Sequence, residues 1–62
     1  MRSFYEDTIA AILEVMGRTD VDPSAVEEVM RDRFRTLDGL YPAEFNREAR
    51  KAVKVLDAIG GV

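Results

Sequence analysis

The stretch from Pro42 to Ile59 constrains the fold most strongly, because its residue pattern predicts one long amphipathic helix. Apolar residues recur at helical spacing on one side: Phe45, Ala49, Ala52, Val53, Leu56 and Ile59. The other side carries bases at spacings i, i+3, i+4 and i+7: Arg47, Arg50, Lys51 and Lys54. Proline is favoured in the first turn of a helix, and Gly60 and Gly61 are expected to end it. We therefore predict a core helix with a basic outer face.

A second helix is predicted near the N-terminus, over residues 4–16. Ser3 and Glu6 have the spacing of a capping box, and Gly17 is placed to end the helix in a left-handed conformation. One apolar stripe is expected to face the core: Tyr5, Ile9, Ile12, Leu13 and Met16. A thinner stripe consists of Phe4, Ala11 and Val15. Two apolar stripes predict that this helix contacts two other helices, or a partner.

A third helix is predicted between these two, over residues 23–37. Asp22 suits the N-cap, Pro23 suits the first turn, and Gly39 is expected to follow the last turn as a left-handed C′ residue. The inward-facing residues are expected to be Val26, Val29, Met30, Phe34 and Leu37. Arg33 falls inside this stripe. Either its stem packs while its guanidinium reaches water, or it is an interface anchor paired with a carboxylate.

These segments predict an all-α protein with a single domain over residues 1–62. The architecture is a small three-helix bundle (helices about 4–16, 23–37 and 42–59) with up-down-up topology. A chain this short has little core, and it contains no cysteine or histidine, which excludes disulfides and most zinc sites. Self-association is therefore an expected source of stability. Val55 lies off the core stripe of its helix. Either this helix is the central one of the bundle and is buried on several sides, or Val55 meets Phe4 and Val15 of a second copy in a homodimer.

Catalysis has little support in the sequence. The usual neutral-pH base and the strongest nucleophile are absent, and no carboxylate is expected among apolar neighbours that would raise its pKa. Residues 20–24 resemble the start of a calcium loop, but Ala25 and Arg31 stand where that loop needs glycine and glutamate. We predict no enzyme, no catalytic residue, no metal and no cofactor. No targeting or membrane segment is visible, so we expect a cytoplasmic protein without a membrane partner.

Charge is the remaining functional signal. The net charge is −3, and it is distributed unevenly: residues 1–30 hold seven acids and two bases, whereas residues 31–62 hold five acids and seven bases. We predict that the protein binds an acidic surface of another protein, or a second copy of itself, through Arg47, Arg50, Lys51 and Lys54, with Arg33 and Tyr41. A solvated surface with screened charges explains the same residues without any partner.

A nucleic-acid-binding role is the alternative. In this alternative, the predicted helices over residues 23–37 and 42–59 form a helix-turn-helix, in which Asn46, Arg47 and Arg50 face the major groove. A sequence pI near 4.8 and the acidic Glu44 at the leading end of the helix argue against it. Arginine is more frequent than lysine, and alanine is also common. This composition is typical of a GC-rich bacterial or phage gene. We expect a small accessory or regulatory factor.

Overall fold

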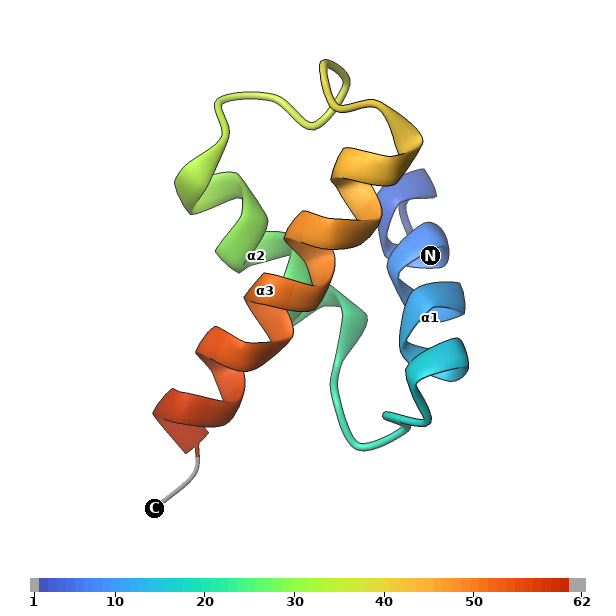
Figure 1. Ribbon diagram of the computed structural model, residues 1–62, viewed down its shortest axis with the longest axis vertical. Helices are drawn as coiled ribbons and strands as arrows, with labels where there is room; N and C mark the ends of the chain where they lie inside the picture. Colours follow the sequence, from blue (N-terminus) through green and yellow to red (C-terminus); the bar gives the residue numbers. More distant parts are fainter. Residues whose placement is uncertain (1, 61–62) are drawn as a thin grey trace.

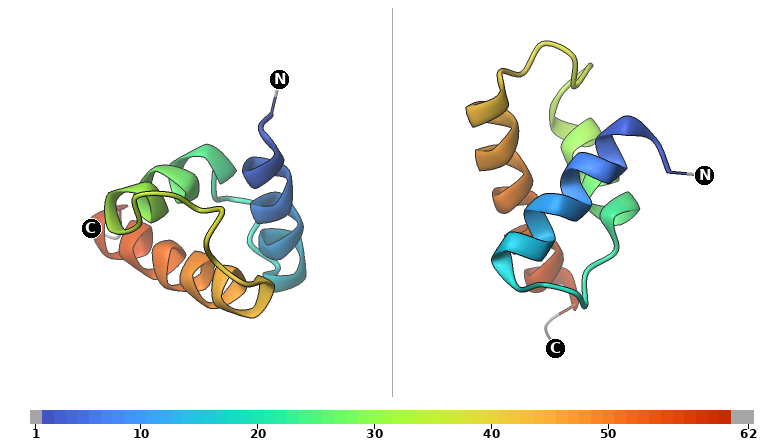
Figure 2. Two further views of the ribbon diagram at one scale, coloured as in Figure 1. Left: turned by 90° about the horizontal axis from the view of Figure 1, so that it is seen from above. Right: turned by 90° about the vertical axis from the view of Figure 1, so that its right-hand side faces the viewer.

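The computed structural model describes residues 2–60, which form three α-helices: α1 (Phe4–Met16), α2 (Pro23–Arg33) and α3 (Pro42–Gly60). In Figure 1, α1 and α3 run down the picture and α2 runs up. Seen from above, the three helices surround a common centre (Figure 2). The predicted all-α three-helix bundle with up-down-up topology is therefore confirmed. Gly61, which was expected to help end the last helix, lies outside the described residues.

The predicted caps of α1 and α2 are present. Ser3 Oγ accepts the backbone N–H of Glu6 at 3.1 Å, and the same hydroxyl donates to Glu27 Oε1 of α2 at 3.0 Å. Gly17 ends α1 with φ of 74°, in the left-handed region that favours glycine. Asp22 Oδ1 accepts the N–H of Ser24 at 3.0 Å at the start of α2. The Ser3 side chain thus caps one helix and ties it to another.

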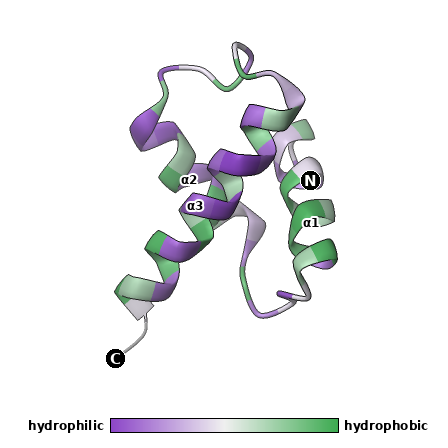
Figure 3. Cartoon of the chain, viewed as in Figure 1, coloured by the Kyte–Doolittle hydropathy of each residue, from purple (hydrophilic) through white to green (hydrophobic). Residues whose placement is uncertain are grey.

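A single apolar core joins all three helices and the connection between α2 and α3. Its buried side chains are Ile9, Ile12, Leu13, Val26, Met30, Leu37, Phe45, Ala49, Ala52 and Val53. As predicted, α1 contacts both α2 and α3, although only its first stripe packs into the core. Figure 3 shows how far hydrophobic residues extend along α1, whereas hydrophilic and hydrophobic residues alternate along α3. The second stripe of α1, with Phe4 and Val15, remains exposed.

The prediction that α2 continues to residue 37 is wrong, because the helix ends at Arg33. Phe34 has extended backbone angles, although its N–H still donates to Met30 O at 2.9 Å. Further along, Thr36 Oγ1 accepts the N–H of Asp38 at 3.2 Å. Such local bonds from threonine to the backbone compete with helix formation. The connection between α2 and α3 therefore spans eight residues, 34–41.

This connection folds back onto the core. Leu37 is only 2% exposed although it lies outside any helix, and the N–H of Leu40 donates to Leu37 O at 3.2 Å across a turn. The prediction that Gly39 is a left-handed C′ residue is also wrong. Helix α2 ends six residues before Gly39, and within residues 2–60 only Gly17 has a positive φ. Burial of Leu37 favours the turn over a longer α2.

The prediction that Ile59 belongs to the core is wrong as well, since 70% of this residue is exposed. The cause is a mismatch of lengths. At about 1.5 Å per residue, the 19 residues of α3 extend about 28 Å, against about 16 Å for the 11 residues of α2. The last turn of α3 therefore extends past its neighbours, as Figure 1 shows at the C-terminal end. No helix within residues 2–60 is long and apolar enough to cross a bilayer.

Candidate functional site

Three of the predicted binding residues meet at one carboxylate. Glu48 Oε1 lies 3.1 Å from Arg33 Nη1, while Glu48 Oε2 lies 3.4 Å from Lys51 Nζ and 3.8 Å from Arg47 Nε. Arg33 comes from the last turn of α2, and the other residues come from α3. The cluster thus fastens the end of α2 to the middle of α3, and Arg33 is paired with a carboxylate of its own chain.

Glu48 was missed by the sequence analysis, which expected no carboxylate among apolar neighbours. The residue is only 8% exposed, beside the buried Ala49 and Ala52. Its Oε1 is buried and accepts no well-aligned hydrogen bond, because the Arg33 N–H is close but not directed at it. Burial of a carboxylate is tolerated when cations lie close to it. The position of Arg33 inside an apolar stripe was the signal that could have indicated an acidic partner on the facing helix.

The basic face of α3 is defined here as Arg47, Arg50, Lys51 and Lys54, and all four side chains are exposed. They border a shallow depression of about 530 Å³ together with Ala43 and Asn46. Arg50 Nε donates to Asn46 Oδ1 at 2.7 Å. Among the residues that the structure describes, neither Arg50 nor Lys54 forms an ion pair.

Local charge on this face is strongly positive. Its four bases and Arg33 make five cations, and Glu48 is the one acid paired with any of them within residues 2–60, which leaves +4. Because the protein as a whole carries −3, the basic face is a concentration of charge opposite to the net charge. This arrangement favours an anionic ligand with several negative groups.

Tyr41 does not join this cluster. It lies directly before α3, where its N–H donates to Glu44 Oε1 at 3.3 Å and its carbonyl accepts the N–H of Phe45 at 2.8 Å. Its ring is exposed and does not border the depression on α3. Tyr41 therefore serves the start of the helix through its backbone, and its side chain is free to contact a partner.

The three residues predicted for self-association are all exposed large apolar side chains. Phe4 and Val15 lie 11 residues apart on α1, which places them on the same side of that helix. Val55 lies on α3, near the end opposite to Pro42. The structure describes one chain, so their meeting in a homodimer stays a prediction.

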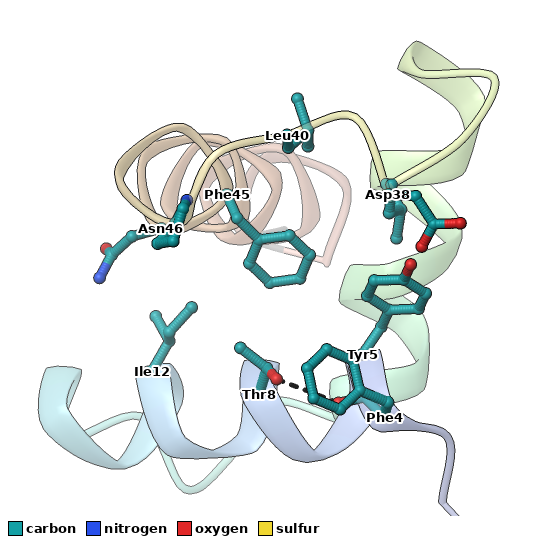
Figure 4. Close-up of a pocket in the computed structure, with 10 residues that line it drawn as sticks. Phe4, Tyr5, Thr8, Ile12, Asp38, Leu40, Phe45 and Asn46 are labelled. Carbon is teal, nitrogen blue, oxygen red and sulfur yellow. Dashed lines mark hydrogen bonds between the residues drawn. The ribbon is translucent and has the colours of Figure 1, made fainter.

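An apolar groove that the sequence analysis did not predict lies between the first turns of α1, the connection 34–41 and the first turns of α3 (Figure 4). Its volume is about 340 Å³. Most of its lining is aromatic or aliphatic: Phe4, Tyr5, Ile12, Leu37, Leu40, Pro42 and Phe45. The polar lining residues are Thr8, Asn46 and Asp38. The Tyr5 and Phe45 rings stack at 6.0 Å between centroids, and Phe4 meets Tyr5 edge-on at 5.5 Å.

At the far end of the bundle, Arg18 links the end of α1 to the end of α3. Its guanidinium donates two hydrogen bonds to Asp57, at 2.7 and 3.0 Å, and two to Asp20, both at 3.1 Å. These bonds lower the pKa of both aspartates below the usual range and raise the pKa of Arg18. The bidentate contact fixes the geometry of both helix ends.

Within the described residues, no group of three or more acidic, histidine or cysteine side chains is arranged to hold a metal ion. Comparisons with protein-family models, with curated proteins and with solved structures found no match.

Proposed function

We propose that this protein is a small, non-enzymatic interaction module whose basic face on α3 binds an acidic surface of another protein. The observation that carries the proposal is the excess of positive charge there: three cations, Arg33, Arg47 and Lys51, share the single carboxylate of Glu48, and two more cations lie on the same face. Arg50 and Lys54 form no ion pair within residues 2–60, so a partner would meet two cations already available for pairing.

An acidic protein suits this face better than DNA. The eight-residue connection 34–41 is longer than the three or four residues that join the helices of a helix-turn-helix. Asn46, which would read bases in that alternative, already accepts a hydrogen bond from Arg50. The negative net charge would also repel a duplex at long range. Nucleic-acid binding through α3 remains the alternative function.

A second copy of the chain is one acidic partner within this proposal. The outer side of α1 carries Asp7 and Glu14 beside the exposed Phe4 and Val15. In a homodimer, this side would offer both the negative charge that the basic face needs and an apolar surface to bury. The proposed setting is the cytoplasm of a bacterium or of a phage-infected cell, where the protein acts as an accessory or regulatory factor.

A titration with a defined acidic polypeptide tests the proposal. The probe is a fluorescent glutamate-rich peptide, and its anisotropy reports binding at low and at physiological salt. Surface ion pairs are worth about 0.2–1 kcal/mol each, so the variant R50E/K54E should lose about tenfold in affinity. The matched control is R2E/R35E, which changes the net charge equally but lies outside the basic face. It should keep its affinity within about threefold of wild type.

Three results would count against this function. If the control variant loses as much affinity as R50E/K54E, only the overall charge matters. If the peptide fails to bind at low salt, the basic face has no preference for acidic polypeptides. If a duplex DNA of equal charge binds more tightly and depends steeply on salt, the nucleic-acid alternative replaces the proposal. Light scattering at micromolar concentration decides whether a second copy is the partner.

A further inference from the structure

We propose that the apolar groove between α1 and α3 binds a peptide segment of a partner protein, in which a large apolar side chain stands next to an arginine or lysine. The groove has the composition of a binding site, because its lining is mainly aromatic and aliphatic with a few polar groups at its edges. This site adjoins the basic face of α3 at Asn46 but prefers the opposite charge.

The apolar part of the segment is set by the middle of the groove. Phe45 and Leu37 form its floor and are nearly fully buried, whereas Phe4 stands at its rim with 77% of the residue exposed. Covering an exposed phenylalanine beside a hollow lined by other rings removes apolar surface from water, which favours binding. A leucine-sized side chain placed in the middle of the groove would contact Phe45 and cover part of the exposed Phe4.

The charge of the segment is set by Asp38. Of the ten described residues that line the groove, Asp38 alone is charged. Its carboxylate forms no ion pair or side-chain hydrogen bond within residues 2–60, since only its backbone N–H is engaged, by Thr36. The guanidinium of the nearby Arg31 lies 5.5 Å from the centroid of the Tyr5 ring, but its charge is already paired, because Arg31 Nε lies 2.8 Å from Glu27 Oε2. A basic side chain at this end would find an available carboxylate.

The opposite end of the groove fixes the direction of the segment. Figure 4 shows Asn46 and Ile12 at one end and Asp38 and Tyr5 at the other, with Phe45 between them. Arg50 is held at the Asn46 end by a 2.7 Å hydrogen bond. Positive charge at one end and negative charge at the other orient a peptide so that its basic residue lies against Asp38.

A double-mutant cycle with two blocked dipeptides tests the inference. The probes are acetyl-Leu-Arg-amide and acetyl-Leu-Gln-amide, and binding is followed through the backbone amide signals of Thr8, Leu40 and Asn46 in NMR spectra. Wild type should bind the arginine peptide about threefold more tightly than the glutamine peptide, as expected for one exposed charge pair. The variant Asp38→Asn should bind both peptides equally, with the affinity that wild type has for the glutamine peptide.

The control is Asp32→Asn, which makes the same chemical change on the exposed side of α2, away from the groove. It should keep the wild-type preference for arginine. Equal binding of the two peptides by wild type, or an unchanged preference in Asp38→Asn, would overturn the charge assignment. Absence of shifts at these amides at millimolar peptide would overturn the site itself. Shifts that depend on protein concentration without any peptide would show that a second copy fills the groove, and would also overturn the proposal.

Discussion

Replacing Leu37 by alanine tests whether the connection between α2 and α3 is part of the core or merely covers it. The side chain is 2% exposed, so the substitution removes apolar atoms from a packed site. Buried leucine-to-alanine changes cost about 2–5 kcal/mol, depending on how far the site collapses. Because a loop can relax more than a helix, we expect about 3 kcal/mol. A 62-residue domain has about 3–9 kcal/mol of total stability, so this loss is a large fraction.

Urea denaturation followed by circular dichroism measures the change, and thermal unfolding checks it. A loss of about 3 kcal/mol should lower Tm by about 12–24 °C. Leu40→Ala is the matched control: the same atoms are removed from the same connection, but at a partly buried position, and about 1 kcal/mol is expected. If Leu37→Ala costs less than about 1 kcal/mol, or no more than the control, Leu37 does not hold the connection onto the core.

Two further predictions concern the glycines and the response to acid. Gly17→Ala should lower the free energy of unfolding by about 1 kcal/mol, because a side chain at positive φ is strained. Gly39→Ala should be neutral or slightly stabilising, because Gly39 has no positive φ and an added Cβ meets open space. Urea denaturation compares the stability of the two variants. Arg18 lowers the folded-state pKa of Asp20 and Asp57, so their contribution to stability is present above about pH 4 and is lost as the pH falls through the lowered values. Arg18→Gln should flatten this dependence in denaturation curves between about pH 2 and 6, and an unchanged curve would contradict it.

The parts of the fold that could be predicted from sequence are those decided by neighbours in the chain. Ser3, Gly17 and Asp22 act on backbone groups within a few residues, so local spacing is enough to identify them. The end of α2 could not be found in this way. Its position depends on Leu37 turning back into a core that α1 and α3 build, and no local pattern at residues 34–41 contains that information.

The same distinction between local and long-range information applies to the candidate site. Exposure of the basic face follows from helical spacing alone, and sequence analysis identified those residues. The pairing of Arg33 with Glu48 depends on how α2 and α3 rotate against each other, which local patterns do not determine. Predicting the groove requires more than the relative rotation of two helices, because three segments far apart in sequence supply its lining. Tyr5 and Phe45 were predicted as core residues and Phe4 as a self-association residue, and their arrangement around a hollow became visible only in the folded chain.

Asn46 connects the two proposed binding surfaces. It borders the depression on the basic face of α3, and it also lines the end of the groove opposite Asp38. A partner segment that lies across Asn46 would therefore contact the positive basic face first, then the apolar groove, and then the negative end of the groove at Asp38. A segment complementary to both proposed surfaces would have acidic residues first, a large apolar residue next and a basic residue last. Because Arg50 contacts Asn46 directly, R50E should weaken such a segment more than it weakens the blocked Leu-Arg dipeptide. Equal weakening of both would mean that the two surfaces do not act on one partner.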